Sequence, residues 1–358
     1  MAELLTQAVA LHRSGEPAQA LDHARLAVSQ AQSDHLPSAV VANALLIEGT
    51  LLAQTPAVEE AVAVLRTAQH AASADPGPGA LHMQYHVSLA LGRTLRTAGR
   101  YRDAEHELRR LLTFTEERLS PDSPETAFVL NELGMVHRYA GHFDEAAQIY
   151  QKALTLVETH VGPDSTEAAA VLHNLAGLAH ARGDHRTADR LARQGIAIRV
   201  QADGPHSPST AADRAAYAAI LIDLHRVAEA QEILREVLAA YERLYGRDHY
   251  EVAVTLHNLA AAQAATGDHT GAAREFARAA RIKMQVLGPR HPELATTLCN
   301  LAQVLLRAGD IHQARRHAIH CVDILESVVD PAHPTLAAAR TLLASLDSNP
   351  APDLTSDR

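Results

Sequence analysis

The feature that most constrains the fold is a spacing of small residues that recurs along almost the whole chain. Eight alanines mark it: Ala20, Ala61, Ala104, Ala146, Ala188, Ala230, Ala272 and Ala314. The steps between them are 41, 43 and then five of 42 residues. A second series, the loop openers Ser120, Gly162, Gly204, Gly246, Gly288 and Asp330, repeats every 42 residues. A fixed period of this length predicts stacked copies of one structural unit.

Each unit is expected to form two helices. In "AVTLHNLAAAQAATG" and "ATTLCNLAQVLLRAG" the apolar residues recur at intervals of three and four, which is helical periodicity. Pro or Ser near the end of most of these loops suits the start of the first helix. Glycines suited to its end follow at one register, where His225 once replaces Gly: Gly99, Gly141, Gly183, Gly267 and Gly309.

The repeated alanines are predicted to lie where the second helix crosses the first. Seven residues after each of them stands another residue that is mostly small: Ala27, Ala68, Leu111, Ala153, Gly195, Val237, Ala279 and Cys321. Small side chains let helix axes approach at the short end of the usual range of about 8–10 Å.

The segment "HPELATTLCNLAQVLLRAGDIHQARRHAIHCVDILESVV" resembles the 42-residue tetratricopeptide repeat of the kinesin-light-chain type. The matching signs are the "HP" loop, the first helix "TLCNLA", the turn "GDIHQA" and the exit "LGPRHP". The resemblance implies an all-α, right-handed superhelical solenoid of about eight two-helix repeats and a C-terminal capping helix, over residues 1–347. The repeats are expected near 2–33, 36–75, 79–119, 121–160, 163–202, 205–245, 247–287 and 289–329, with the cap at 333–347 and a disordered tail at 348–358.

Composition excludes several classes of function. The formal charge of −10 and the absence of a long basic run argue against nucleic-acid binding. We see no signal peptide and no apolar window of about 18 residues, so we expect a cytoplasmic protein without a membrane span. Two cysteines are too few for a disulfide framework. Thirty Arg against two Lys suggest a GC-rich, bacterial coding genome.

In the family that the chain resembles, Asn at one register of the first helix binds the backbone of an extended peptide in the concave groove. The carry-over falls on Asn174, Asn258 and Asn300, whereas Ala216 breaks the column and Glu132 alters it. Such an Asn could instead bridge adjacent helices through their backbone carbonyls, and both interpretations stay open. The residues directly before Glu132, Asn174 and Asn258 are Asn131, His173 and His257, and they are further groove candidates.

Charge and size are predicted to vary along this groove. Arg93, Arg96, Arg138 and Arg307 are expected to face it or its rim, where Arg could bind a carboxylate or merely be solvated. The middle is lined by small residues: Ala170, Gly177, Ala212, Ala215, Ala216, Ala219, Ala261, Ala264 and Ala265. This lining leaves room for bulky ligand side chains, or for the repeats to close on one another.

The histidines and cysteines are expected to be mostly structural. The pairs His317–His320 and His82–His86 have helical spacing but no further converging ligands. Cys321 lies in the packed small-residue column and Cys299 in the groove column, so their thiols are predicted to point differently. The loop histidines His206, His249, His291 and His333 recur with the repeat. We predict no metal and no cofactor.

We find no nucleotide-binding, zinc-protease or hydrolase signature, and we do not expect an enzyme. The preferred hypothesis is a protein-interaction module that binds an extended peptide or partner segment in its groove. One alternative is a regulatory receptor whose curvature changes on binding a small peptide or metabolite. A third is an enzyme built on the repeat scaffold.

Overall fold

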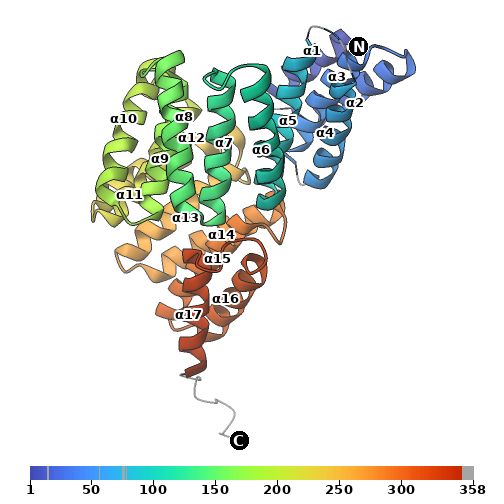
Figure 1. Ribbon diagram of the computed structural model, residues 1–358. Coiled ribbons are helices and arrows are strands. Elements are labelled where there is room, and N and C mark those ends of the chain that lie inside the picture. The colour runs from blue at the N-terminus through green and yellow to red at the C-terminus, as the bar shows by residue number, and fades with distance from the viewer. Residues whose placement is uncertain (14–15, 56, 75–76, 78, 349–358) are drawn as a thin grey trace, which may run out of the picture. The chain divides into compact units, whose positions relative to one another are not determined.

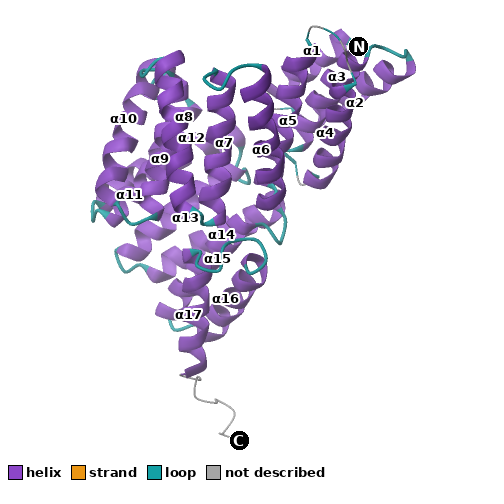
Figure 2. Cartoon of the chain, viewed as in Figure 1, coloured by secondary structure: helices purple, strands orange, loops and turns teal. Residues whose placement is uncertain are grey.

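The computed structural model describes residues 1–13, 16–55, 57–74, 77 and 79–348, and within these ranges the chain is helical with no strand (Figure 2). The helices are α1 (Ala2–Arg13), α2 (Pro17–Ser33), α3 (Ser38–Leu52), α4 (Val58–Ser73), α5 (Ala80–Thr97), α6 (Tyr101–Arg118), α7 (Pro124–Ala140), α8 (Phe143–His160), α9 (Thr166–Ala181), α10 (His185–Asp203), α11 (Pro208–Asp223), α12 (Val227–Tyr245), α13 (Tyr250–Ala265), α14 (His269–Leu287), α15 (Pro292–Arg307), α16 (Ile311–Leu325) and α17 (Pro334–Ser348). The expected tail lies, apart from Ser348, outside the described residues.

The chain divides into two compact units. The first comprises residues 1–137 and 144–161, and the second comprises residues 138–143 and the chain from 162 onward. In the first unit α1, α3 and α5 each pack against the helix that follows, and they contact one another in order. In the second unit α9, α11, α13 and α15 do the same, and α17 packs on α15 and α16 (Figure 1). Each unit is therefore a row of helical hairpins; a single stack over 1–347 stays a prediction.

The first helices begin at one capped register. The hydroxyls of Ser165 and Ser207 accept a hydrogen bond from the backbone N–H three residues on, at 3.1 Å in both cases. At the same register His249, His291 and His333 accept one through Nδ1 from the N–H two residues on. These side chains satisfy N–H groups that have no partner inside the helix. The structural role expected for the loop histidines is thus confirmed at these positions.

The first helices also end as the repeat predicts. Gly183 has a φ of +77°, in the left-handed region that side chains with a Cβ seldom adopt. His225, the residue that replaces Gly in this column, has a φ of +59°. The backbone therefore makes the same left-handed turn with or without glycine.

Small residues hold the helix crossings close. All eight repeated alanines are fully buried. A Cβ on Gly195 of α10 would lie 3.3 Å from the carbonyl oxygen of Ala169 on α9. In the first unit, a Cβ on Gly134 of α7 would lie 2.5 Å from the ring of Tyr150 on α8. This complete burial confirms the predicted packing of the alanine column, and at Gly195 and Gly134 a larger side chain would require its neighbour to shift.

Candidate functional site

Two asparagines of the column each join a first helix of the second unit to the preceding one. The side-chain amide of Asn258 on α13 donates to the carbonyl of Ala215 on α11 at 3.0 Å. Nδ2 of Asn300 on α15 lies 3.2 Å from Nε2 of His257 on α13. Asn174 is buried, with 6% of its surface exposed. Asn258 thus makes the backbone-carbonyl bond between repeats that was the alternative to peptide contact, whereas Asn300 joins the repeats through a histidine side chain.

The residues one position before the asparagines contact the following first helix instead. Nδ1 of His173 on α9 lies 2.8 Å from Oδ1 of Asp213 on α11. His257 pairs with Thr297 on α15, where Nδ1 and the hydroxyl are 3.1 Å apart. The two columns together place a polar seam between successive first helices.

The cysteine prediction is wrong. Cys299 follows the same column into the interface with α17, where its thiol lies 3.7 Å from the carbonyl oxygen of Thr335. Both Cys299 and Cys321 are buried, and they lie close enough that Cys321 lowers the pKa of Cys299 while Cys299 raises that of Cys321. The error arises because this register faces the next repeat, whereas it was assigned to an open groove.

The candidate charges of the first unit pair with one another. Oε1 of Glu132 on α7 lies 2.7 Å from Nε of Arg93, and its Oε2 lies 3.2 Å from Nε of Arg96, both on α5. Only 6% of the Glu132 side chain is exposed, so a charged hydrogen-bonded pair is needed to bury it. Asn131, beside it, is half-buried. These arginines therefore already bind a carboxylate that belongs to the chain.

A cavity of about 350 Å³ lies in the second unit between α9, α11 and α13. Its floor is the alanine-rich face of α11, with Ala212, Ala215, Ala216 and Ala219. Of the sequence candidates it brings together Arg138, His173 and Asn258. Arg307 is exposed at the end of α15 and is not among the residues that line the cavity. The small residues expected in mid-groove thus leave open space here.

Asp213 is a polar cavity residue that the sequence reading missed. Its carboxylate is 8% exposed and lies between His173 and Arg199 of α10, whose Nε is 3.2 Å away. Comparison of the repeats at this register could have identified Asp213. At the same register the other repeats carry Val129, Val171, Thr255 and Thr297, so an aspartate departs from the pattern.

Glu251 is the second acid on the cavity wall, and unlike Asp213 it has few nearby cations to offset its charge. Burial raises its pKa, and the nearby Glu293 raises it further, while His173 and Lys283 act the other way. Glu293 is itself bound: it accepts a hydrogen bond of 2.5 Å from the hydroxyl of Tyr250 and lies 3.7 Å from Nζ of Lys283. Within the described chain, the Glu251 carboxylate has no hydrogen-bond or ion-pair partner.

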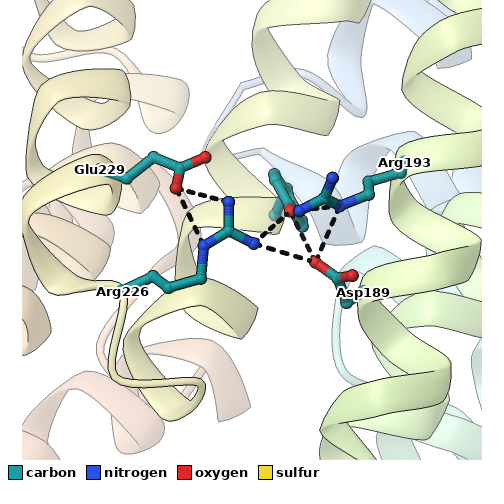
Figure 3. Close-up of polar contacts among 5 residues, drawn as sticks. Asp189, Arg193, Arg226 and Glu229 are labelled. Atoms are coloured by element: carbon teal, nitrogen blue, oxygen red, sulfur yellow. Dashed lines mark hydrogen bonds and ion pairs between the residues drawn. The ribbon is translucent and has the colours of Figure 1, made fainter.

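A polar cluster joins helices of the same repeats (Figure 3). Oδ1 of Asp189 accepts from the hydroxyl of Tyr217 at 2.7 Å and from Nε of Arg193 at 3.0 Å, and Nη1 of Arg226 lies 3.4 Å away. Arg226 also pairs with Glu229, as the figure shows. Burial alone would raise the pKa of Asp189, but the bonds from Tyr217 and Arg193 hold it below its ordinary value. The cluster links α10, α11 and α12.

Metal-ligating residues converge at one place in the described part of the chain. His180, His185 and Asp223 offer ligand atoms that all lie within 4.8 Å of one another. The helical pairs His317–His320 and His82–His86 belong to no such group of three among the described residues.

Comparison with known proteins settles the family. Models of the tetratricopeptide repeat match residues 85–159, 209–285, 252–327 and 293–348, which together cover more than half of the chain. Two further tetratricopeptide repeat models match residues 168–209 and 4–25. The chain belongs to the tetratricopeptide repeat family. Its repeats build an all-α solenoid, as predicted, and family membership supports a scaffold for protein interaction. No curated protein sequence matches this tetratricopeptide repeat chain.

Several solved structures are similar to this tetratricopeptide repeat protein. A Rap protein complexed with competence and sporulation factor is 16% identical, with a TM-score of 0.57 and 87% of each chain covered. The nearly identical TPR-like repeats of a putative kinesin light chain from Podosopora anserina are 22% identical, with a TM-score of 0.44, covering 58% of this chain and 97% of theirs. BtubC (BKLC) from P. vanneervenii is 21% identical, also with a TM-score of 0.44, covering 74% and 96%. The likeness to the Rap protein shows a shared fold.

None of the described helices combines the length and hydropathy that a membrane span needs.

Proposed function

We propose that this chain binds an extended protein or peptide segment along its first helices, and that the cavity between α9, α11 and α13 receives one side chain of that segment. The observation that carries the proposal is the alanine floor of α11, which leaves about 350 Å³ open. This volume lies in the range of ligand pockets, about 300–1,000 Å³.

The break in the Asn column supports this position. Asn174 and Asn258 stand at one register of α9 and α13, and α11 between them has Ala216. Ala216 lines the cavity. An asparagine there would fill part of the space and bond to a neighbouring helix, as Asn258 does. The missing amide therefore creates room at one repeat of the row.

The polar wall indicates what the site would hold. Nδ2 of Asn258 donates to the carbonyl oxygen of Ala215. The side-chain oxygen of Asn258 is left to accept a peptide N–H. Glu251 supplies a carboxylate without a partner among the described residues. A Lys or Arg side chain fits this combination, because its apolar stem can lie on alanines while its cation pairs with Glu251. We therefore propose a basic side chain as the occupant.

A selection experiment tests the proposal without a known partner. The purified full chain would be screened against a displayed library of random peptides, and the affinity of the best synthetic peptide would be measured by fluorescence anisotropy. Ala216→Phe fills the cavity. Ala228→Phe adds the same ring at an exposed position of α12 and is the matched control.

We expect the selected peptides to share a Lys or Arg. We also expect Ala216→Phe to weaken binding at least tenfold, while Ala228→Phe stays within twofold of the wild type. Thermal unfolding by circular dichroism would show that both variants fold. Equal affinity of the wild type and a folded Ala216→Phe variant would refute the cavity as the binding site.

A further inference from the structure

Three side chains with metal-binding atoms meet where α9, α10 and α11 come together. His180 lies in the last turn of α9, His185 opens α10, and Asp223 ends α11. Nε2 of His180 is 2.6 Å from Oδ2 of Asp223, and Nδ1 of His185 is 3.9 Å from the same oxygen. The group therefore lies within one small region of space, although its members come from three helices.

The arrangement suits a transition metal. Two imidazoles and one carboxylate bind first-row divalent ions, with bonds of about 2.0–2.2 Å for zinc. Ligands around such an ion lie roughly 3–4 Å apart, so small rotations of these side chains would close on it. Between 28% and 46% of each side chain is exposed, so an ion can reach the site from solvent.

The repeat itself does not require these residues. One repeat earlier, the register of His180 holds Arg138 and that of His185 holds Phe143. One repeat later, the register of Asp223 holds Ala265. The stack thus folds at these registers with cations, aromatics or alanine. Among the described residues, the three ligands come together at this junction alone, so their combination is not part of the architecture.

One nitrogen of the group is poised for a ligand. Nδ1 of His185 is buried and has no hydrogen-bond partner. His269, two repeats later at the same register, also has a buried Nδ1 without a hydrogen bond. Among the described residues, however, His269 belongs to no group of three possible ligands. His269 is therefore a natural control for His185.

We propose that His180, His185 and Asp223 bind one divalent first-row transition metal ion, such as Zn²⁺, and leave a coordination position open. Three protein ligands are the number found in open zinc sites, where water or an incoming group takes the fourth place. His180 also lines the cavity, so the metal would lie at its edge.

The test is calorimetric titration of the chelator-treated full chain with Zn²⁺, followed by the visible spectrum of the Co²⁺ form. We expect one saturable site that Mg²⁺ does not fill, and intense Co²⁺ bands of a four-coordinate ion. His185→Ala and Asp223→Asn should each weaken this site at least tenfold, whereas His269→Ala should leave it within twofold.

His185→Ala keeps the test informative if Asp223→Asn perturbs folding, since Nδ1 of His185 makes no hydrogen bond that the variant would remove. The proposal is overturned if the wild type shows no saturable Zn²⁺ site. It is equally overturned if His185→Ala binds Zn²⁺ as tightly as the wild type, because the ion would then be held by other histidines.

Discussion

Nδ1 of His173 on α9 lies 2.8 Å from Oδ1 of Asp213 on α11, at the wall of the cavity. The other carboxylate oxygen lies 3.2 Å from Nε of Arg199 on α10. One buried aspartate thus ties together three helices of two successive repeats. The wall of the proposed binding site is therefore stiff before any ligand arrives, which lowers the cost of ordering on binding.

Removing this carboxylate should be costly. Asp213 and Arg199 have only 8% and 14% of their side chains exposed, so Asp213→Ala leaves a buried cation without its main partner. We expect a loss of about 3 kcal/mol in the free energy of unfolding, measured by urea denaturation. Asp203→Ala is the control, because that carboxylate is more exposed and 3.6 Å from Arg199, and it should cost about 1 kcal/mol or less. Equal losses in the two variants would contradict this view of Asp213.

The alanine column predicts a second stability difference. Ala230 is fully buried at a crossing of α12, whereas Ala228, two residues earlier, is exposed. Ala230→Leu should overpack the crossing and cost about 1–3 kcal/mol, and Ala228→Leu should be nearly neutral. Thermal unfolding of the two variants against the wild type measures both. A neutral Ala230→Leu would mean that the repeats do not need close helix approach there.

Burial of His257 predicts a dependence of stability on pH. Its desolvation, with Lys283 nearby, lowers its pKa to about 3, against about 6.5 for an ordinary histidine. Between these values the unfolded chain binds a proton that the folded chain does not, so the free energy of unfolding falls as pH falls. One such group contributes up to about 1.4 kcal/mol per pH unit.

The measurement is the urea midpoint of wild type and His257→Gln from pH 7 to pH 4. Glutamine does not titrate, so the variant should lose less stability on acidification, with a slope smaller by up to about one proton. Parallel curves for the two proteins would show that folding does not change the pKa of His257.

Peptide binding should weaken in acid for a different reason. Burial and Glu293 raise the pKa of Glu251, so its carboxyl takes up a proton at a higher pH than an ordinary glutamate and then cannot pair with a cation. We expect the affinity for the selected basic peptide to fall as pH is lowered from neutral. In Glu251→Gln the affinity should be lower and nearly independent of pH over the same window. Persistence of the full pH dependence in that variant would remove Glu251 from the site.

Much of the fold followed from the sequence because the repeat shows the same requirement many times. The buried alanines and the capping residues of the loops recur with the period of the repeat. The turn after the first helix also recurs, and His225 takes the place of glycine there once. The small residues around Ala216 also indicated, from the sequence, where the cavity could lie.

The side-chain partners could not be predicted in the same way. Register tells which face a residue occupies, but not which residue of the next repeat it meets. For this reason the pairing of Glu132 with Arg93, the bond from Asn258 to Ala215 and the contact between the two thiols came only from the structure. Asp213 is the exception that a comparison of registers would have flagged.

A crystal structure of the full chain with its selected peptide tests the central claim most directly. We expect a Lys or Arg side chain of the peptide to lie on Ala212, Ala216 and Ala219, with its cation within hydrogen-bonding distance of Glu251. A peptide bound on the second helices α10 and α12, with the cavity filled only by water, would contradict the account.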